Sequence, residues 1–368
     1  MSIRIMATAD VHLGMKFSRY DSCQAELVEA RFTALQRAVE AANERDCQLF
    51  LVAGDLFHKL NVAARVVERG AEILSKFAGR LCAVLPGNHD FVSAGDDSLW
   101  QRFGNAAGDS VIVLDAARAY DLDLYDLNVD ILAGPCDSVH GSDHRLTWLR
   151  SYDRRPGRPV VGLAHGSVDG LTLDNEGRYF PMSREFLAGE AADVWIVGHT
   201  HRQHDLSESR LVIPGTPEPD GFDCAGHGAA AFIELTDEGY SVEPVQTGTF
   251  RFVRRTIDIA SDGRFPDDVV GDEPETTLLR LTLQGAVSTE QRNSIRGQLS
   301  DLEERLPFFD VDESRLRKVL NRREVDNVYA EGSFAHAVLT ELLDGDDEAG
   351  AAAASDILDT IDSAGGAT

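Results

Sequence analysis

Short apolar runs alternate with longer amphipathic windows over the first 250 residues of the chain. The runs cover residues 3–8, 49–53, 81–85, 160–164 and 194–197. In the windows, notably 26–44 and 62–77, apolar residues recur every three or four positions. Runs of this length predict buried strands, and the windows predict helices. The alternation therefore predicts an α/β domain in layers, with helices flanking a sheet.

The spacing of apolar runs tightens after residue 109. Runs over 111–114, 121–127 and 129–133 predict hairpin strands, followed by a helical window over 144–149. A second hairpin-like region covers 210–213, 229–235 and 241–245, with turn residues between the runs. We expect mixed β-sheets that change from parallel to antiparallel at one edge.

Residues 266–274 are rich in Asp, Pro and Gly and predict a linker or long loop. Beyond them, a strand over 277–284, a helix over 289–306 and a strand over 308–311 form a βαβ unit, with a further helix over 334–343. We predict a large domain over 1–250, a small α/β domain over 251–343 and a mobile acidic, Ala/Gly-rich tail over 344–368. A short helix around Ile357, Leu358 and Ile361 is the alternative for this tail.

Composition narrows the class of protein. The chain has 368 residues, 43% of them hydrophobic, which is enough for a sizeable core. Its five cysteines are scattered without a C-x-x-C pair, so we expect buried, reduced thiols rather than disulfides or a thiolate metal site. No long apolar stretch follows a basic start, and we therefore expect a soluble, cytoplasmic protein.

The formal net charge of -27 is unusual for a protein that acts on nucleic acid. It indicates either that the substrate is not DNA or that the proteome as a whole is acidic, as in a salt-adapted or GC-biased organism. The basic residues are 31 Arg and only four Lys, an imbalance that favours the second interpretation. Local charge near a site then matters more than the total.

Four polar strings follow predicted strands, where open α/β sheets bind ligands. They are Asp10-Val11-His12, Gly54-Asp55-Leu56-Phe57-His58, Gly87-Asn88-His89-Asp90 and Gly198-His199-Thr200-His201. A single His or Asp at a strand end is more often a hydrogen-bonded cap, but four such strings in order indicate a two-metal site. His165 ends a further strand and supplies another imidazole. Oxygen and nitrogen ligands without sulfur suit manganese, iron or zinc.

These strings resemble the motifs of the calcineurin-like metallophosphoesterases. More narrowly, the chain resembles the SbcD and Mre-eleven type DNA repair exonucleases, in their shorter bacterial branch. The narrower resemblance rests chiefly on Leu13-Gly14 and His58. The wider resemblance to the metallophosphoesterases covers about the first 250 residues, and the motifs also include His165-Gly166 and Ile213-Pro214-Gly215-Thr216.

The resemblance implies two divalent metal ions, with manganese expected first and iron or zinc as alternatives. One ion would be held by Asp10, His12, Asp55 and His201, and the other by Asp55, Asn88, His165 and His199. His89 would face the scissile phosphate, with His58 assisting there. The alternative for His58 is a histidine that only supports a ligand or lies at the surface. Asp90 is expected to orient an imidazole.

Basic residues shortly after the motifs are candidates for contacts to a phosphodiester backbone. They are Lys16, Arg19, Lys59 and Arg202. The resemblance also implies DNA as partner, an SbcC-like coiled-coil ATPase and a homodimer, but no membrane. The small second domain would cap the active site; the alternative is a dimerisation or stabilising module. Little sequence follows that domain for an ATPase-binding segment.

Three functions are compatible with these observations. The first is a sequence-independent DNA exonuclease or endonuclease, and the second is a phosphodiesterase or phosphatase for a small molecule such as a cyclic nucleotide. The third, an inactive scaffold, conflicts with the intact ligand set. A Ser/Thr protein phosphatase is disfavoured, because its motifs carry Glu after the His and Asp-Arg-Gly after the bridging carboxylate.

Overall fold

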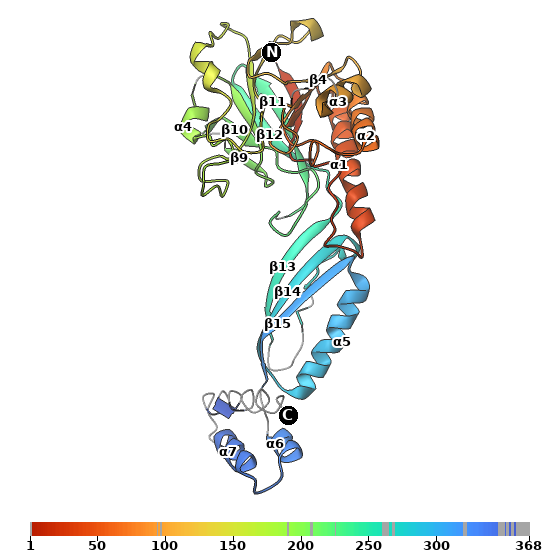
Figure 1. Cartoon of the computed structure of the whole chain (residues 1–368), viewed down its shortest axis with the longest axis vertical. Coiled ribbons are helices and arrows are strands. Elements are labelled where there is room, and N and C mark those ends of the chain that lie inside the picture. Colours follow the sequence, from red (N-terminus) through yellow and green to blue (C-terminus); the bar gives the residue numbers. More distant parts are fainter. Residues whose placement is uncertain are drawn as a thin grey trace. The chain divides into compact units, whose positions relative to one another are not determined.

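In a computed structural model, the chain forms two compact units, Met1–Phe252 and Val253–Thr368, which we describe separately (Figure 1). The structure describes residues 2–357 apart from 94, 96, 97, 190, 207, 208, 225, 260–264, 267, 268, 319–321, 345–349, 351, 352, 355 and 356. Part of the predicted linker and most of the predicted tail, including Leu358 and Ile361, lie outside the described residues.

Two six-stranded mixed sheets form the first unit, which confirms the predicted fold class. The first sheet has the order β12-β11-β1-β2-β3-β4, and the second has the order β5-β6-β7-β8-β10-β9. The strands of the first sheet are β1 (Ile3–Thr8), β2 (Leu49–Ala53), β3 (Leu81–Leu85), β4 (Val111–Val113), β11 (Ala229–Thr236) and β12 (Gly239–Gln246). Those of the second are β5 (Ala119–Asp121), β6 (Asp130–Gly134), β7 (Val160–His165), β8 (Val194–Gly198), β9 (His204–Leu206) and β10 (Leu211–Ile213).

Alternation along the central strands produces three apolar layers. Even-numbered positions of β1 and β2, such as Met6 and Phe50, pack under the helices of the first unit. Odd positions, such as Ile5 and Leu51, pack against the inner face of the second sheet. Because both faces are buried, these strands are continuous apolar runs, as the sequence indicates. A third cluster, around Trp195, covers the outer face of the second sheet.

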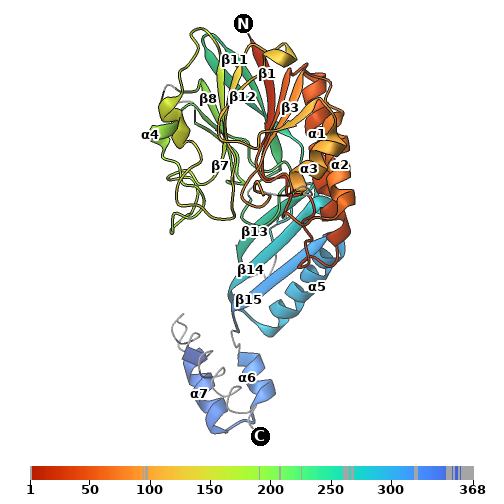
Figure 2. The same cartoon turned by 45° about the horizontal axis from the view of Figure 1, so that its top comes forward.

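Three helices cover the outer face of the first sheet (Figure 2). They are α1 (Gln24–Glu44), α2 (Ala64–Ser75) and α3 (Leu99–Ala107), and the short helix α4 (Arg184–Leu187) belongs to the second sheet's side. The sheets place the carboxyl ends of β1, β2 and β3 side by side, since these strands pair in parallel. β7 and β8 are also parallel, so their carboxyl ends lie together too.

The second unit is a three-stranded sheet with an amphipathic helix. The sheet has the order β13-β14-β15, and its strands are β13 (Arg251–Asp258), β14 (Thr277–Val287) and β15 (Phe308–Lys318). Helix α5 (Thr289–Arg305) begins with a capping box at Ser288 and packs Ile295 against the sheet. Two shorter helices follow, α6 (Arg322–Val328) and α7 (Phe334–Leu343).

Some predicted elements are wrong or were missed. The strand predicted over 121–127 ends at Asp121, whose carboxylate accepts a hydrogen bond from the Asp123 backbone amide at 2.8 Å and starts a 3₁₀ turn, Asp123–Tyr125. The helical window over 144–149 is likewise a 3₁₀ helix, Thr147–Ser151. The sequence reading missed α3, β9, β13 and α6. In β13 three consecutive exposed residues interrupt the alternation on which the prediction rests.

All five cysteines are buried and none is disulfide-bonded, as expected. Among the described residues, no helix combines the length and apolar character that a membrane span requires.

Candidate metal centre

The loops after β1 and β2 run side by side and are joined by backbone hydrogen bonds. The Asp10 amide donates to the Gly54 carbonyl at 3.1 Å, and the His12 amide donates to the Asp55 carbonyl at 2.9 Å. From the second sheet, the Asp10 carboxylate accepts the His199 amide at 3.1 and 3.0 Å. The fourth motif is joined in the same way, because the His89 amide donates to Asp55 Oδ1 at 2.9 Å. All four sequence motifs are therefore connected through main-chain donors at this edge.

Four of the predicted ligands have left-handed backbone conformations. Their φ angles are 53° for Asp10, 48° for His12, 53° for Asp55 and 92° for His199. Such conformations cost about 1–3 kcal/mol each in residues other than glycine, and they persist only where the surroundings hold them. Their concentration at these strand ends is typical of a functional site.

Glycine allows the motif loops to pack this closely. A Cβ on Gly87 would lie 2.2 Å from Asp55 Oδ1, and a Cβ on Gly198 would lie 1.9 Å from the Ala53 carbonyl oxygen. Either contact is far inside van der Waals distance, so larger residues there would push the loops apart. These glycines have a structural role in placing the ligands.

One cluster of ligand atoms, which we call group A, contains Asp10, His12 and His201. His201 Nε2 lies 3.4 Å from His12 Nε2 and 3.7 Å from Asp10 Oδ1. His12 Nε2 in turn lies 3.7 Å from Asp55 Oδ2. Asp10 and His12 are buried, and the His201 side chain is 29% exposed.

A second cluster, group B, contains Asn88, His165 and His199. Asn88 Oδ1 lies 3.1 Å from His165 Nε2 and 3.2 Å from His199 Nδ1. His165 Nε2 lies 3.4 Å from Asp55 Oδ2. The other ring nitrogen of His165 donates to the Ala53 carbonyl at 2.9 Å, which leaves Nε2 as the nitrogen that a metal ion would bind.

These spacings fit two divalent cations. Ligand atoms at about 2.0–2.2 Å from one ion are separated by roughly 2.8–3.6 Å when the coordination angles are near 90–110°, and the distances within the two groups lie in or just above this range. Asp55 Oδ2 borders both groups, at 3.7 Å from His12 and 3.4 Å from His165, so one carboxylate can bridge two ions. Both groups consist of oxygen and nitrogen donors.

Buried charges at the centre perturb the pKa values of their neighbours. Burial lowers the pKa of His165, but the Asp55 and Asp10 carboxylates outweigh it and raise that pKa to about 9. Burial and the nearby His165 lower the pKa of His199 to about 3. The two carboxylates thus attract positive charge, and a bound cation would replace protons held by the histidines.

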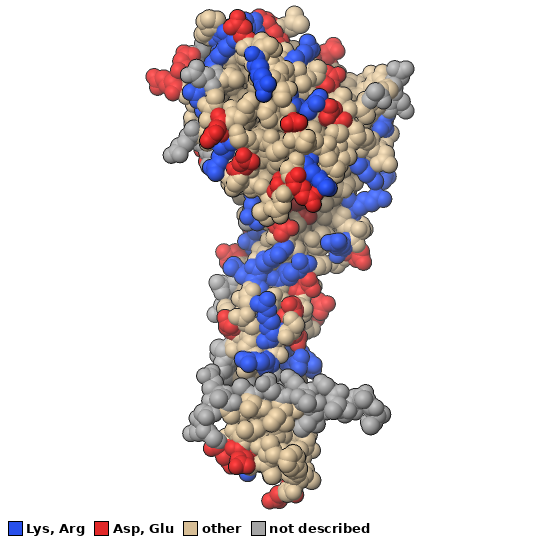
Figure 3. All heavy atoms as spheres, turned by 60° about the vertical axis from the view of Figure 1, so that its left-hand side comes forward, with Lys and Arg blue, Asp and Glu red and all other residues tan. Residues whose placement is uncertain are grey.

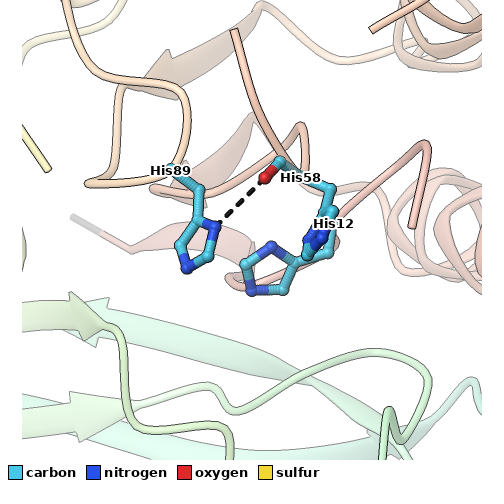
Figure 4. Close-up of side chains that lie close together, drawn as sticks. All are labelled: His12, His58 and His89. Carbon is cyan, nitrogen blue, oxygen red and sulfur yellow. Dashed lines mark hydrogen bonds between the residues drawn. The ribbon is translucent and has the colours of Figure 1, made fainter. Parts of the chain in front are cut away.

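His58 and His89 lie beside group A and are not part of either ligand group (Figure 4). Their rings stack at 24°, with centroids 5.5 Å apart, and the His12 ring meets His89 edge-on at 4.8 Å. His89 Nδ1 lies 3.1 Å from the His58 carbonyl oxygen and donates to it, which leaves Nε2 for a substrate. The three histidines are themselves close enough to be a further candidate ligand cluster.

Asp90 does not orient an imidazole, contrary to expectation. Its buried carboxylate accepts hydrogen bonds from the Gly87 amide at 2.7 Å and the Phe57 amide at 2.8 Å. Burial raises the pKa of this carboxyl to about 8. Asp90 therefore joins the loops after β2 and β3 through their backbones.

Replacing Asp90 by Ala is expected to destabilise the fold. Two buried amides would lose their acceptor, at about 1–3 kcal/mol each. We expect the free energy of unfolding of the metal-free protein to fall by about 2–6 kcal/mol, measured by urea denaturation. Asp223→Ala, an exposed aspartate, is the control and should change it by less than about 0.5 kcal/mol. An unaltered midpoint for Asp90→Ala would contradict the role of these hydrogen bonds.

The predicted substrate-binding residues are all exposed, but they do not form one cluster. Lys16 and Lys59 line a pocket of about 630 Å³, together with Arg65, which the sequence reading missed. Arg202 lines another pocket, of about 250 Å³, and donates to the Asp223 carbonyl at 2.7 Å. Arg19 is not among the residues that line either pocket.

Two further residues support group A and were also missed. Asp220 Oδ2 accepts a hydrogen bond from His201 Nδ1 at 2.8 Å, and it lies 3.5 Å from Arg31 Nη2. Arg31 is 1% exposed although it is an arginine. It occupies the apolar stripe of α1 between Leu27 and Leu35, and a charge at such a position was the available signal.

Known proteins are similar to this chain. The calcineurin-like phosphoesterase family matches residues 3–203. The chain is 21% identical to the uncharacterized metallophosphoesterase YhaO of Bacillus subtilis over 332 residues, 83% of this chain and 78% of that protein. It is 24% identical to the DNA double-strand break repair protein Mre11 of Aeropyrum pernix over 285 residues, 71% of this chain and 64% of that protein, less than two thirds of its length.

Among solved structures, TT1561 of Thermus thermophilus is 15% identical, covers 66% of this chain and 99% of its own, and has a TM-score of 0.42. A phosphoesterase from E. coli, Yfce, is 16% identical over 67% of this chain and all of its own, with a TM-score of 0.31.

The family match extends over more than half of the chain and includes Asp10, Asp55, Asn88, His165, His199 and His201. Members of this family use a binuclear divalent metal centre, and groups A and B have the donor atoms and spacing for one. The chain belongs to the calcineurin-like phosphoesterase family, and it is a metal-dependent phosphoesterase.

Proposed function

We propose that this phosphoesterase is a nuclease of the SbcD and Mre-eleven type, which hydrolyses DNA phosphodiester bonds without regard to sequence. The observation that carries the proposal is a pocket lined by three basic residues, Lys16, Lys59 and Arg65, which we call the basic pocket. Lys59 follows His58 directly, and it lines the pocket with Lys16 and Arg65. Cations placed beside a phosphoester-cleaving centre suit a substrate that continues beyond the scissile phosphate.

The formal net charge of -27 does not argue against a polyanionic substrate. On the face drawn in Figure 3, acidic and basic side chains are mixed over the first unit rather than separated into a single acidic surface. No acidic residue is among those lining the pocket of Lys16, Lys59 and Arg65. The field that a phosphate meets there is set by these nearby cations, because charges beyond about 10 Å are largely screened at ordinary ionic strength.

When two metal ions are bound, they supply a hydroxide nucleophile near neutral pH and neutralise charge on the phosphoryl oxygens. Asp55 holds the two ligand groups in register, and its Oδ1 accepts the His89 amide at 2.9 Å, which fixes the start of the His89 loop. His89 then directs Nε2 at the substrate. Because Nδ1 keeps its proton on the His58 carbonyl, this role needs a second proton on Nε2; His89 would hold it against the phosphoryl group and give it to the departing oxygen, and the ring would return to its neutral form.

His58 supports His89 in this scheme. Its carbonyl holds His89 Nδ1, and its stacked ring limits the rotation of the His89 ring. Burial lowers the pKa of His58, so this imidazole is neutral at physiological pH. A neutral ring can approach the cationic surroundings of the metal centre without repulsion.

The similarity to Mre11 of Aeropyrum pernix agrees with the proposal, since that protein is named for DNA double-strand break repair. We further propose an SbcC-like coiled-coil ATPase and a second copy of this chain as partners, and manganese as the resident metal.

The second candidate function is hydrolysis of a small phosphodiester such as a cyclic nucleotide. It is favoured by a centre whose ligand groups are complete without any part of the second unit.

Substrate comparison distinguishes these functions. The purified protein with Mn²⁺ is incubated with linear duplex DNA, single-stranded DNA, a cyclic nucleotide and an aryl phosphate, over a series of salt concentrations. We expect cleavage of DNA with kcat/KM well above that for the small esters. Turnover of the cyclic nucleotide or the monoester alone, at every salt concentration, would rule out the nuclease.

Charge removal in the basic pocket gives a second prediction. The triple substitution Lys16→Gln, Lys59→Gln and Arg65→Gln should weaken DNA binding. It should also reduce the slope of log affinity against log salt concentration by about 0.7–0.9 for each phosphate that is no longer neutralised. Hydrolysis of bis(4-nitrophenyl) phosphate should stay within about twofold, because this ester does not extend past the metals. Lys76→Gln, which removes a lysine paired with Glu72 on α2, is the control. A slope unchanged in the triple variant would exclude the pocket from DNA binding.

A further inference from the structure

Group A and group B are held in place by different kinds of contact. In group B, His165 donates to a main-chain carbonyl, and Asn88 Nδ2 donates to the Val139 carbonyl at 3.4 Å. In group A, the orienting contact on His201 is a side-chain carboxylate, that of Asp220. A single substitution can therefore remove the support of group A without touching that of group B.

Asp220 is itself fixed by a buried arginine. Its Oδ2 lies between His201 Nδ1, at 2.8 Å, and Arg31 Nη2, at 3.5 Å. The Asp220 side chain is 13% exposed and that of Arg31 is 1% exposed, so water screens their attraction little. The Cys224 thiol also lies 3.1 Å from Asp220 Oδ1.

Arg31 also holds the other two members of group A. Its Nη1 donates to the Val11 carbonyl at 2.7 Å and lies 3.4 Å from the Asp10 carbonyl oxygen. These carbonyls belong to the loop in which Asp10 and His12 have left-handed φ angles. Arg31 thus binds that loop by hydrogen bonds from Nη1, while its Nη2 faces Asp220 as an ion pair without a hydrogen bond.

We infer that the Arg31–Asp220 pair is a positioning device for one of the two metal sites, and that it sets the affinity of group A for its divalent cation independently of group B. A carboxylate that accepts a hydrogen bond from a ligating imidazole fixes its tautomer, aims the free nitrogen and makes it a stronger donor. Here the hydrogen bond at Nδ1 leaves His201 Nε2 directed at Asp10 and His12. This inference rests on the binuclear centre of the family and not on the identity of the substrate.

The test measures metal stoichiometry. Metal-free protein is dialysed against a series of free Mn²⁺ concentrations, and bound manganese per chain is measured by mass spectrometry. The wild type should reach two ions. Asp220→Ala should hold one ion over the range in which the wild type holds two, and its second site should fill at about 10–100-fold higher free metal. Asp220→Asn, which keeps an acceptor oxygen but loses the charge, should lie between them.

Two companion variants identify the weakened site. His165→Ala, in group B, should also hold one ion, and the double variant Asp220→Ala/His165→Ala should hold almost none at the same free metal. Asp223→Ala is the matched control in the same loop and should bind two ions like the wild type. Melting of each metal-free variant, followed by circular dichroism, tests whether the fold is intact.

The possible outcomes are distinct. Two unchanged affinities in Asp220→Ala would overturn the inference, as would an equal loss at both sites. A metal-free melting temperature that falls in both Asp220 variants, with neither site able to bind, would show a general structural role instead. Retention of one ion in Asp220→Ala, and its loss only when His165 is also replaced, supports the assignment whether or not DNA is the substrate.

Discussion

Asp55→Ala is expected to empty both metal sites at once and to lower the turnover of any phosphoester by at least about a thousandfold. Among the described residues, Asp55 Oδ2 is the carboxylate oxygen that lies within 3.7 Å of a histidine in each ligand group. Its removal takes a negative charge from both groups, where a bound metal contributes several kcal/mol to stabilising the transition state. Since each 1.36 kcal/mol is a factor of ten in rate, a loss of about 4 kcal/mol is a thousandfold effect.

Metal content and activity should be measured on the same preparation. We expect fewer than one manganese per chain in Asp55→Ala, under conditions that load two in the wild type. His165→Ala serves as the comparison. His165 belongs to group B and not to group A, so this variant should keep one ion. A single tightly bound ion in Asp55→Ala would mean that Asp55 belongs to one group and is not a bridge.

The structure brings the candidate ligands that the sequence singled out close together, because each lies at or just after the end of a strand that is buried on both faces. Leu49–Ala53 and Leu81–Leu85 are continuous apolar runs, and the polar string that follows each one marks the edge of the sheet. Parallel pairing then brings these strings together. The proximity of the candidate ligands could therefore be predicted without any side-chain geometry.

Supporting residues could not be predicted in the same way, because their roles depend on contacts across the fold. Asp220 meets His201 and Arg31 through a loop far along the chain, and no local pattern signals that meeting. For Asp90 the sequence predicted a role, but the role was wrong. Its position beside Asn88 indicated an imidazole partner, whereas its carboxylate binds backbone amides of two loops.

The second unit illustrates a different limit. The helix over 289–306 was predicted nearly to its ends, because the capping box at Ser288 and Gln291 is a local signal. Strand β15 continues seven residues beyond its predicted end at Val311, since its second half is mostly charged and has a single apolar residue, Leu316, packed against the core. Edge strands such as β13 and β15 carry this kind of sequence, and hydrophobic periodicity alone does not find them.

His89→Ala is expected to keep both metal ions and to lose about 10²–10⁴-fold in kcat, the usual contribution of a positioned acid or base. His89 contributes no atom to group A or group B, so manganese content should stay at the wild-type value. KM should change little if the metals and the basic pocket provide most of the binding. His336→Ala, a histidine that bonds Asp326 in the second unit, is the control and should leave kcat unchanged.

The leaving group shows what His89 does. Cleavage of DNA expels a strongly basic alkoxide that needs a proton, whereas bis(4-nitrophenyl) phosphate expels a weakly basic phenolate that does not. If His89 donates that proton, the deficit of His89→Ala should be large on DNA and should shrink at least tenfold on the aryl ester. An equal deficit on both substrates would assign His89 to stabilising charge on the phosphoryl oxygens alone, and undiminished turnover on DNA would remove it from the catalytic machinery.

His58→Ala should show the same dependence on the leaving group with a smaller deficit, because in this arrangement its ring acts through that of His89.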